Sequence, residues 1–258
     1  MSLRFGLRAA ACAFVMSIAA PAGAQSAAES ANVRPTLQAD GDSDVPTLTQ
    51  LFTRSLRGFA QVPAADNLEW LAAGGVAALA THAADRETSR VIAESRALDA
   101  PLEAGAFVGG TPFELGAAFA AYSLGRAFDN GRLARAGADL VQAQLIAESL
   151  TLAIKEATRR ARPSGTGYSF PSGHATAAFA SATVLQQHFG WQVGLPAYFV
   201  ATYVGASRIH DRRHYLSDVA FGAVLGTIAG RAVTVNRRHR VTVGVAPADG
   251  GGAVVIGM

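Results

Sequence analysis

The chain is poor in several residue types. Its 258 residues include one cysteine, Cys12, and only one lysine, Lys155, among 22 basic residues. A single cysteine excludes an internal disulfide and any site built from several thiolates. Charged residues make up 16% and aromatic residues 8% of the chain, against 50% hydrophobic residues with abundant alanine and 27 glycines. This composition favours closely packed helices, and the length is sufficient for one domain with its own core.

The first 24 residues have the pattern of a secretory signal peptide. Arg4 and Arg8 precede an apolar run at 9–20, and small residues at 22–24 provide a cleavage position. The run is shorter than the roughly 20 residues that cross a bilayer, which favours cleavage over an uncleaved anchor. Cleavage would remove Cys12 and the two arginines, and would lower the formal net charge from +3 to +1. We therefore expect no nucleic-acid partner.

Apolar periodicity and turn residues divide the remaining chain into a linker, a helical domain and a tail. Residues 25–46 show no apolar period and are predicted to form a flexible linker. Residues 47–234 are predicted to form a helical domain, with helices near 47–60, 66–82, 85–98, 112–128, 138–159, 171–190, 194–207 and 214–234. Alternating valines and a glycine-rich turn in residues 235–258 predict a short β-hairpin. The predicted fold class is all-α, a helical bundle with a short C-terminal β-hairpin.

Three short motifs fall at the ends of the predicted helices. They are Lys155 with Arg162-Pro163 after six residues, then Pro171-Ser172-Gly173-His174, then Ser207-Arg208 with His214 after five residues and Asp218 after three more. Short connections make successive helices antiparallel, so a helix end, a start, an end and a start meet at one end of a four-helix bundle. The order of the motifs along the chain therefore predicts that they lie together.

The second motif has the features of an anion site. Pro171 suits the first turn of a helix, where its missing N–H costs nothing. Ser172 and Gly173 would then present free backbone N–H groups at the positive end of the helix. His174 beside them can give a proton to a leaving oxygen. Taken alone, the motif fits an ordinary capped helix start equally well.

The third motif pairs a histidine with a carboxylate. His214 and Asp218 are one helical turn apart, so the carboxylate can accept the Nδ1 hydrogen and leave Nε2 as a nucleophile. Taken alone, the pair also fits an exposed helix ion pair. Arg208 adds a planar phosphate clamp, and Lys155 adds a compact ammonium in a chain that otherwise uses arginine. Third and fourth ligands for a metal are missing from the pattern, so no metal is expected.

Together the motifs resemble the pattern of the type 2 phosphatidic acid phosphatase and vanadium haloperoxidase superfamily. That pattern is Lys-x6-Arg-Pro, Pro-Ser-Gly-His and Ser-Arg-x5-His-x3-Asp, and this chain matches every fixed position within 155–218. The resemblance implies an all-helical bundle and a phosphatase that needs no metal. It implies that the phosphate oxygens are bound by Lys155, Arg162, Arg208, Ser172 and Gly173. It also implies that His174 is the general acid. His214 would be the nucleophile that forms a phosphohistidine, and Asp218 would orient it.

Three functions are compatible with this pattern. The first is hydrolysis of phosphate or diphosphate monoesters, of small molecules or of lipids, without a cofactor. The second is a haloperoxidase with vanadate as cofactor in the same pocket, which the short chain disfavours because such enzymes are usually much longer. The third is a non-catalytic anion-binding envelope protein. The leader predicts export to the bacterial cell envelope, with the periplasm favoured. There it could be soluble or membrane-associated, and placement in the inner membrane is the alternative because residues 175–207 contain no Lys, Arg, Asp or Glu.

Overall fold

The computed structural model describes residues 45–235, 242–248 and 251–257 and shows an all-helical bundle, as the sequence predicts. The signal peptide at 1–24 and nearly all of the linker at 25–46 lie outside the described residues, and the division of the chain into these segments stays a prediction. The elements are α2 (Leu48–Gln61), α3 (Ala65–His82), α4 (Asp85–Ala93), η3 (Arg96–Leu98), α5 (Asp99–Leu102), α6 (Gly105–Val108), α7 (Thr111–Ala127), α8 (Gly131–Thr158), α9 (Gly173–Phe189), α10 (Trp191–His210) and α11 (Leu216–Thr234).

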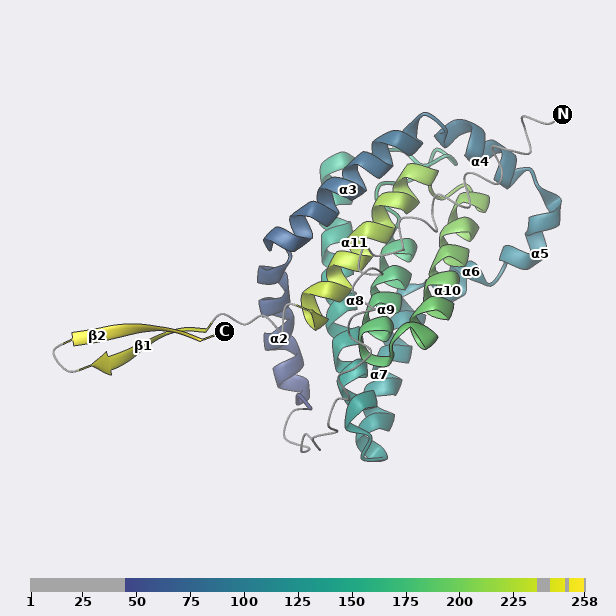
Figure 1. Ribbon diagram of the computed structural model, residues 1–258. Helices are drawn as coiled ribbons and strands as arrows, with labels where there is room; N and C mark the ends of the chain where they lie inside the picture. Colours follow the sequence, from purple (N-terminus) through teal and green to yellow (C-terminus); the bar gives the residue numbers. More distant parts are fainter. Residues whose placement is uncertain (1–44, 236–241, 249–250, 258) are drawn as a thin grey trace.

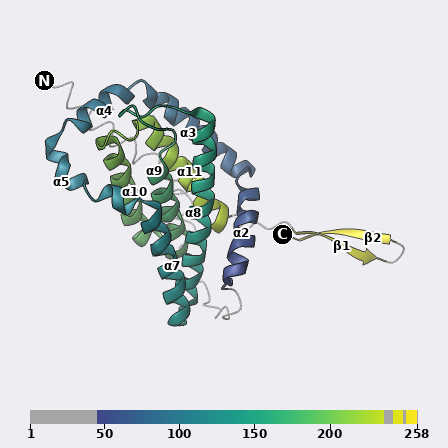
Figure 2. The same ribbon diagram turned by 180° about the vertical axis from the view of Figure 1, so that it is seen from behind.

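Helix α9 lies at the centre of the bundle. It packs against α8, α10 and α11, while α7 lies along α8 and α3 lies along α11 (Figures 1 and 2). The short helices α4, α5 and α6 pass beside α10. The largest fully buried apolar side chains come from α8, α9, α10 and α11: Ile146, Phe179, Val184, Val204, Val219, Val224 and Ile228. Helices α9 and α11 contribute to two apolar clusters, one completed by α10 and the other by α7 and α8.

The contact between α9 and α11 depends on a row of glycines. Gly222, Gly226 and Gly230 recur every four residues and so lie on one face of α11. A Cβ atom at Gly222 would lie 2.8 Å from the carbonyl oxygen of Ser172, and one at Gly226 would collide with the carbonyl of Thr176. Only glycine permits this close approach. The start of α11 is thereby held against the start of α9, where two of the motifs lie.

Several helix boundaries differ from those predicted. The single helix expected at 85–98 ends at Ala93, and η3 and α5 follow it. Helix α8 begins at Gly131, before the predicted start, because the Asn130 side chain caps it by accepting a hydrogen bond from the Leu133 N–H at 3.0 Å. Helix α10 begins at Trp191 and contains Pro196 near its start, where the lost N–H leaves most of the helical hydrogen bonds intact.

Two strands follow the helices. Strand β1 (Thr242–Ala248) and strand β2 (Gly251–Gly257) pair antiparallel with Thr242 opposite Gly257. They lie apart from the helices (Figures 1 and 2). Within the described part of the chain, α11 is the helix long and apolar enough to cross a membrane by composition, yet 89% of that stretch is buried inside the protein. The functional residues predicted from the sequence all lie within the helical bundle and precede the two strands.

Candidate active site

The structure brings the three motifs to one end of the bundle. Lys155 lies in the last turn of α8, and its Nζ is 2.7 Å from the carbonyl oxygen of Pro171. Ser172 caps α9, and its N–H donates to the carbonyl of Asp218 at 3.0 Å. The His214 N–H donates to the carbonyl of Arg208 at 3.2 Å. These hydrogen bonds tie the end of α8, the start of α9, the end of α10 and the start of α11 together, as the order of motifs predicts.

His214 is buried, with 4% of its surface exposed, and its ring is oriented by a backbone carbonyl. Its Nδ1 lies 2.6 Å from the carbonyl oxygen of Ser169. A carbonyl oxygen only accepts hydrogen bonds, so Nδ1 carries the hydrogen. Burial is the largest influence on the pKa of His214 and lowers it, which favours the neutral ring. In the neutral ring Nε2 is then the unprotonated nitrogen, as a nucleophile requires.

Asp218 is placed differently from the prediction. His214 precedes α11 rather than starting it, and the Asp218 Oδ2 atom is 3.8 Å from Nδ1, farther than the Ser169 carbonyl. The same Oδ2 accepts the N–H of Tyr215 at 2.8 Å, which caps the helix. A carboxylate at this capping position satisfies a free helical N–H, and this use competes with a short bond to the histidine. In place of the predicted short hydrogen bond, the Asp218 carboxylate therefore keeps a longer contact of 3.8 Å with the neutral His214 ring.

Arg208 has an unused donor in the site. Only 5% of its surface is exposed, and one guanidinium nitrogen pairs with Asp211. Its Nε is buried and finds no hydrogen-bond partner among the residues that the structure describes. Burial, followed by the nearby charges of Arg213 and Arg162, lowers the pKa of Arg208. An anion would satisfy the free Nε–H and offset the mutual repulsion of these arginines.

The other two predicted cations lie around the loop that joins α8 to α9. Lys155 Nζ donates to the carbonyl oxygens of Pro171, Tyr168 and Ser169 at 2.7, 3.2 and 3.5 Å. Arg162 Nε donates to the Tyr168 carbonyl at 3.2 Å. An ammonium has three donors, so a direct Lys155–phosphate bond requires that the longest of these contacts, to Ser169, be given up. Gly173 remains partly accessible at the first position of α9.

His174 lies in the first turn of α9 beside this charge cluster. Burial, then the positive charge of Arg208 and the neighbouring His214, lower the pKa of His174 to about 4. The carbonyl of Ala106, in α6, accepts a hydrogen bond from the ring and opposes the shift. A Cβ atom at Gly109 would lie 3.3 Å from the His174 Cβ, so the end of α6 is packed directly on this residue. His174 is thus neutral in the empty site at pH 7, and an arriving phosphate anion would raise its pKa.

Two features of this site were not predicted from the sequence. The Ser169 carbonyl that orients His214 and the Ala106 carbonyl that contacts His174 are backbone groups, which leave no signal in residue type. Within the described ranges, no group of three or more His, Cys, Asp and Glu residues is placed to hold a metal ion. The cations Lys155, Arg162 and Arg208 lie around the site and are suited to an anionic ligand.

Lys155 gives a test of the cationic site through pH. Burial, ahead of the repulsion from Arg162, lowers the pKa of Lys155 to about 8. The charged form exists below that pH, so we expect kcat/KM for a phosphate ester to fall as pH rises through about 8. Lys155→Arg keeps its charge there and should lose this alkaline limb. The wider guanidinium fits the three carbonyls poorly, so kcat/KM at pH 7 should also fall about 10–100-fold. An alkaline limb that persists unchanged in Lys155→Arg would contradict the assignment.

An all-helical bundle with two histidines and several cations gathered at one end is the arrangement that the motif resemblance implies. The family model described as PAP2 superfamily matches residues 150–241, a range that contains every residue predicted for the site. This segment of the chain, residues 150–241, belongs to the PAP2 superfamily.

Similar proteins include phosphatases. A lipid A 1-phosphatase of Porphyromonas gingivalis is 43% identical over 76 residues, which are 28% of this chain and 17% of that protein's length. The PAP2 type phosphatidylglycerolphosphate phosphatase from Bacillus subtilis, a transmembrane protein, is 22% identical, with a TM-score of 0.48 over 74% of this chain and 96% of that one. LpxE from Aquifex aeolicus is 23% identical, with a TM-score of 0.48 over 58% of this chain and 93% of that one.

Proposed function

We propose that the protein is a phosphatase that hydrolyses phosphate or diphosphate monoesters of lipids through a phosphohistidine at His214. The observation that carries this proposal is the orientation of His214. Its Nδ1–H is held by the Ser169 carbonyl, and the free nitrogen belongs to a buried ring beside His174 and the cation Arg208. A fixed nucleophile, a candidate acid and charge for an anionic transition state are the requirements of phosphoryl transfer.

The proposed reaction has two steps. In the first, the Nε2 lone pair of His214 attacks phosphorus, the bond from phosphorus to the ester oxygen breaks, and His174 gives its proton to that oxygen, releasing the alcohol. In the second, water attacks the phosphohistidine, its proton passes to His174, and the phosphorus–nitrogen bond breaks to return the electron pair to Nε2. Arg208, Lys155 and Arg162 offset the charge on the phosphoryl oxygens, and Ser172 and Gly173 offer helix-start donors.

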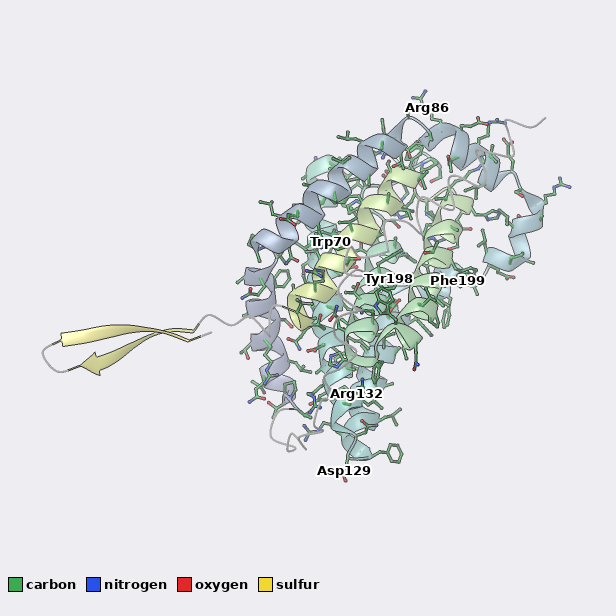
Figure 3. The ribbon with its side chains drawn as sticks, in the orientation of Figure 1. Trp70, Arg86, Asp129, Arg132, Tyr198 and Phe199 are labelled. Atoms are coloured by element: carbon green, nitrogen blue, oxygen red, sulfur yellow. The ribbon has the colours of Figure 1, made fainter. Side chains whose placement is uncertain are left out.

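The outer surface of the bundle supports a lipid substrate. Large apolar side chains with more than half of their surface exposed occur on α3, α6 and α10 and directly after α7, among them Leu68, Val76, Leu79, Phe107, Phe128, Leu195 and Phe199. Figure 3 shows that Phe199 lies on the outer side of α10, whereas its neighbour Tyr198 points into the bundle, where its hydroxyl is 2.9 Å from the Thr183 hydroxyl. Extended apolar surface of this kind is typical of proteins that bind membranes.

We further propose that the protein is exported and associates with a membrane of the cell envelope, where lipid phosphates are available. The names of the similar phosphatases, which refer to lipid A and phosphatidylglycerolphosphate, support this substrate class. If the proposal is correct, the full chain should sediment with the membrane fraction and need detergent for release. Recovery in the soluble fraction without detergent would contradict it.

The function is tested by a substrate panel. Purified protein in detergent is given lipid phosphate monoesters, lipid diphosphates and soluble phosphate monoesters, with and without a chelator, and released phosphate is measured. We expect faster release from the lipids, no effect of the chelator because cations of the protein meet the phosphate charge, and no release by His214→Ala. Bromide oxidation with vanadate and peroxide, without phosphate release, would instead support a haloperoxidase. Phosphate binding without either reaction would support an anion-binding protein.

A further inference from the structure

Arg160 connects helices α4 and α11 beside the site. Its Nη1 donates to Asp218 Oδ1 at 2.7 Å and to the Ser217 hydroxyl at 2.8 Å, and its Nη2 donates to Asp85 Oδ2 at 2.7 Å. The guanidinium also lies 4.4 Å from the ring centroid of Tyr215. A planar guanidinium stacked on an aromatic ring and bonded at two nitrogens has little freedom to move. Arg160 therefore holds the Asp218 carboxylate in one orientation.

Asp85 fixes the other side of this arginine. It is the first residue of α4, and only 2% of its surface is exposed, although the sequence places it in a charged surface helix. Its Oδ1 accepts the N–H of Ser217 at 2.9 Å, and its Oδ2 accepts the Ser217 hydroxyl at 2.6 Å. His82, which is mostly exposed, contributes its Nδ1 at 3.0 Å from Oδ2. A buried carboxylate with this many partners is a rigid anchor.

Both acceptors that face His214 Nδ1 are connected to Arg160. The side chain of Arg160 holds Asp218, which is 3.8 Å from Nδ1. Its backbone carbonyl accepts the N–H of Ser169 at 2.7 Å, and the carbonyl of Ser169 in turn lies 2.6 Å from Nδ1. Loss of the side chain would leave two buried carboxylates without their shared cation, which is costly unless they move. Arg160 is thus placed to control the surroundings of the nucleophile His214. Its own side chain is bonded to carboxylates and a hydroxyl, and it is not one of the cations predicted to bind phosphate.

We propose that Arg160 and Asp85 are positioning residues for His214, acting through Asp218 and Ser169. This inference rests on the proposed function, because it assigns the pair a part in presenting the nucleophile. It makes the pair distinct from Lys155, Arg162 and Arg208, which act on the phosphate. Substitutions in the pair and in the three phosphate-binding cations should therefore have different effects when binding and turnover are measured separately.

The kinetic test compares neighbouring arginines. Arg160→Gln should lower kcat about 10–100-fold, the rate equivalent of one lost hydrogen bond to a charged group, while the affinity for vanadate stays within a few-fold because the phosphate cations remain. Arg159→Gln is the matched control, since Arg159 is largely exposed and, among the described residues, its side-chain hydrogen bond and its ion pair are both made with Glu156. Equal kcat in the two variants, or a parallel loss of vanadate affinity and kcat in Arg160→Gln, would overturn the proposal.

Asp85→Asn is a second variant of nearly unchanged shape, which guards against misfolding of Arg160→Gln. It should also lower kcat, and the losses in the double variant should be smaller than the product of the single losses, because both residues act through one chain of contacts. Independent losses that multiply would contradict a shared role.

A measurement without turnover separates this inference from the proposed function. Nitrogen NMR of histidine-labelled protein reports which ring nitrogen of His214 carries the hydrogen. Wild-type protein and Arg159→Gln should show the hydrogen on Nδ1, whereas Arg160→Gln should shift the signals in the same direction as Asp218→Asn. Signals in Arg160→Gln that coincide with wild type would overturn the positioning role, whether or not the protein hydrolyses any substrate in the panel. If the wild-type protein hydrolyses no substrate in the panel but Arg160→Gln still shifts the His214 signals, the result would count against the proposed function alone.

Discussion

His214→Ala is expected to lower the rate of phosphate ester hydrolysis by at least about 10,000-fold, because no other group can replace the nucleophile. The alanine removes the short hydrogen bond to the Ser169 carbonyl, which keeps its longer contact with Lys155, and leaves the cations and His174 in the chain. Phosphate or vanadate should therefore still bind. The measurement is single-turnover release of the alcohol from a lipid phosphate, compared with wild type.

His214→Gln serves as the companion variant for folding. Its amide can donate to the Ser169 carbonyl and fill most of the space, but it lacks a nucleophilic nitrogen. Both variants should melt near the wild-type temperature and be equally inactive. Substantial hydrolysis by His214→Gln would show that water is activated directly and that no covalent intermediate is needed.

His174→Ala is expected to show a loss that depends on the leaving group. For an alkyl phosphate, whose oxygen must be protonated as it leaves, the rate should fall about 100–10,000-fold. For an ester of an acidic phenol, which leaves as a stable anion, the loss should be much smaller. Steady-state kcat across esters whose leaving groups differ in pKa measures this dependence.

The pH profile gives the same assignment a second test. The pKa of His174 is about 4 in the empty site, and the negative phosphate beside it should raise that value in the complex. Because the acid form is the one that donates, kcat should fall as pH rises through this raised pKa. His174→Ala should lack that limb with the activated ester. Equal losses for good and poor leaving groups would assign His174 to phosphate binding instead of proton transfer.

The meeting of the motifs could be predicted because it follows from helix order. Lys155 ends one helix and Ser172 caps the next, and antiparallel packing then places both beside Arg208 and His214. The residue types in the motifs predicted the kind of chemistry. The match of residues 150–241 to the PAP2 superfamily model confirms the predicted superfamily for that segment. The turn before α8 could also be predicted, because Asn130 is a strong capping residue.

Contacts that depend on tertiary packing could not be predicted. Asp85 was placed in a surface helix because its neighbours are charged, yet it is buried by the start of α11. Arg160 lies between the fixed positions of the first motif, where spacing says nothing about side-chain contacts. The orientation of His214 depends on the Ser169 carbonyl, and every residue type has such a carbonyl. The 3.8 Å distance from His214 Nδ1 to Asp218 could not be predicted either, because it depends on the same carboxylate capping α11.

The phosphohistidine is tested most directly by trapping it. Wild-type protein is mixed with a phosphate-labelled lipid ester, quenched in alkali to preserve a phosphorus–nitrogen bond, digested and examined by mass spectrometry. The mechanism predicts one labelled peptide, modified at His214, that forms as fast as the alcohol is released and is missing in His214→Ala. Label on another residue, or the same label in His214→Ala, would contradict it.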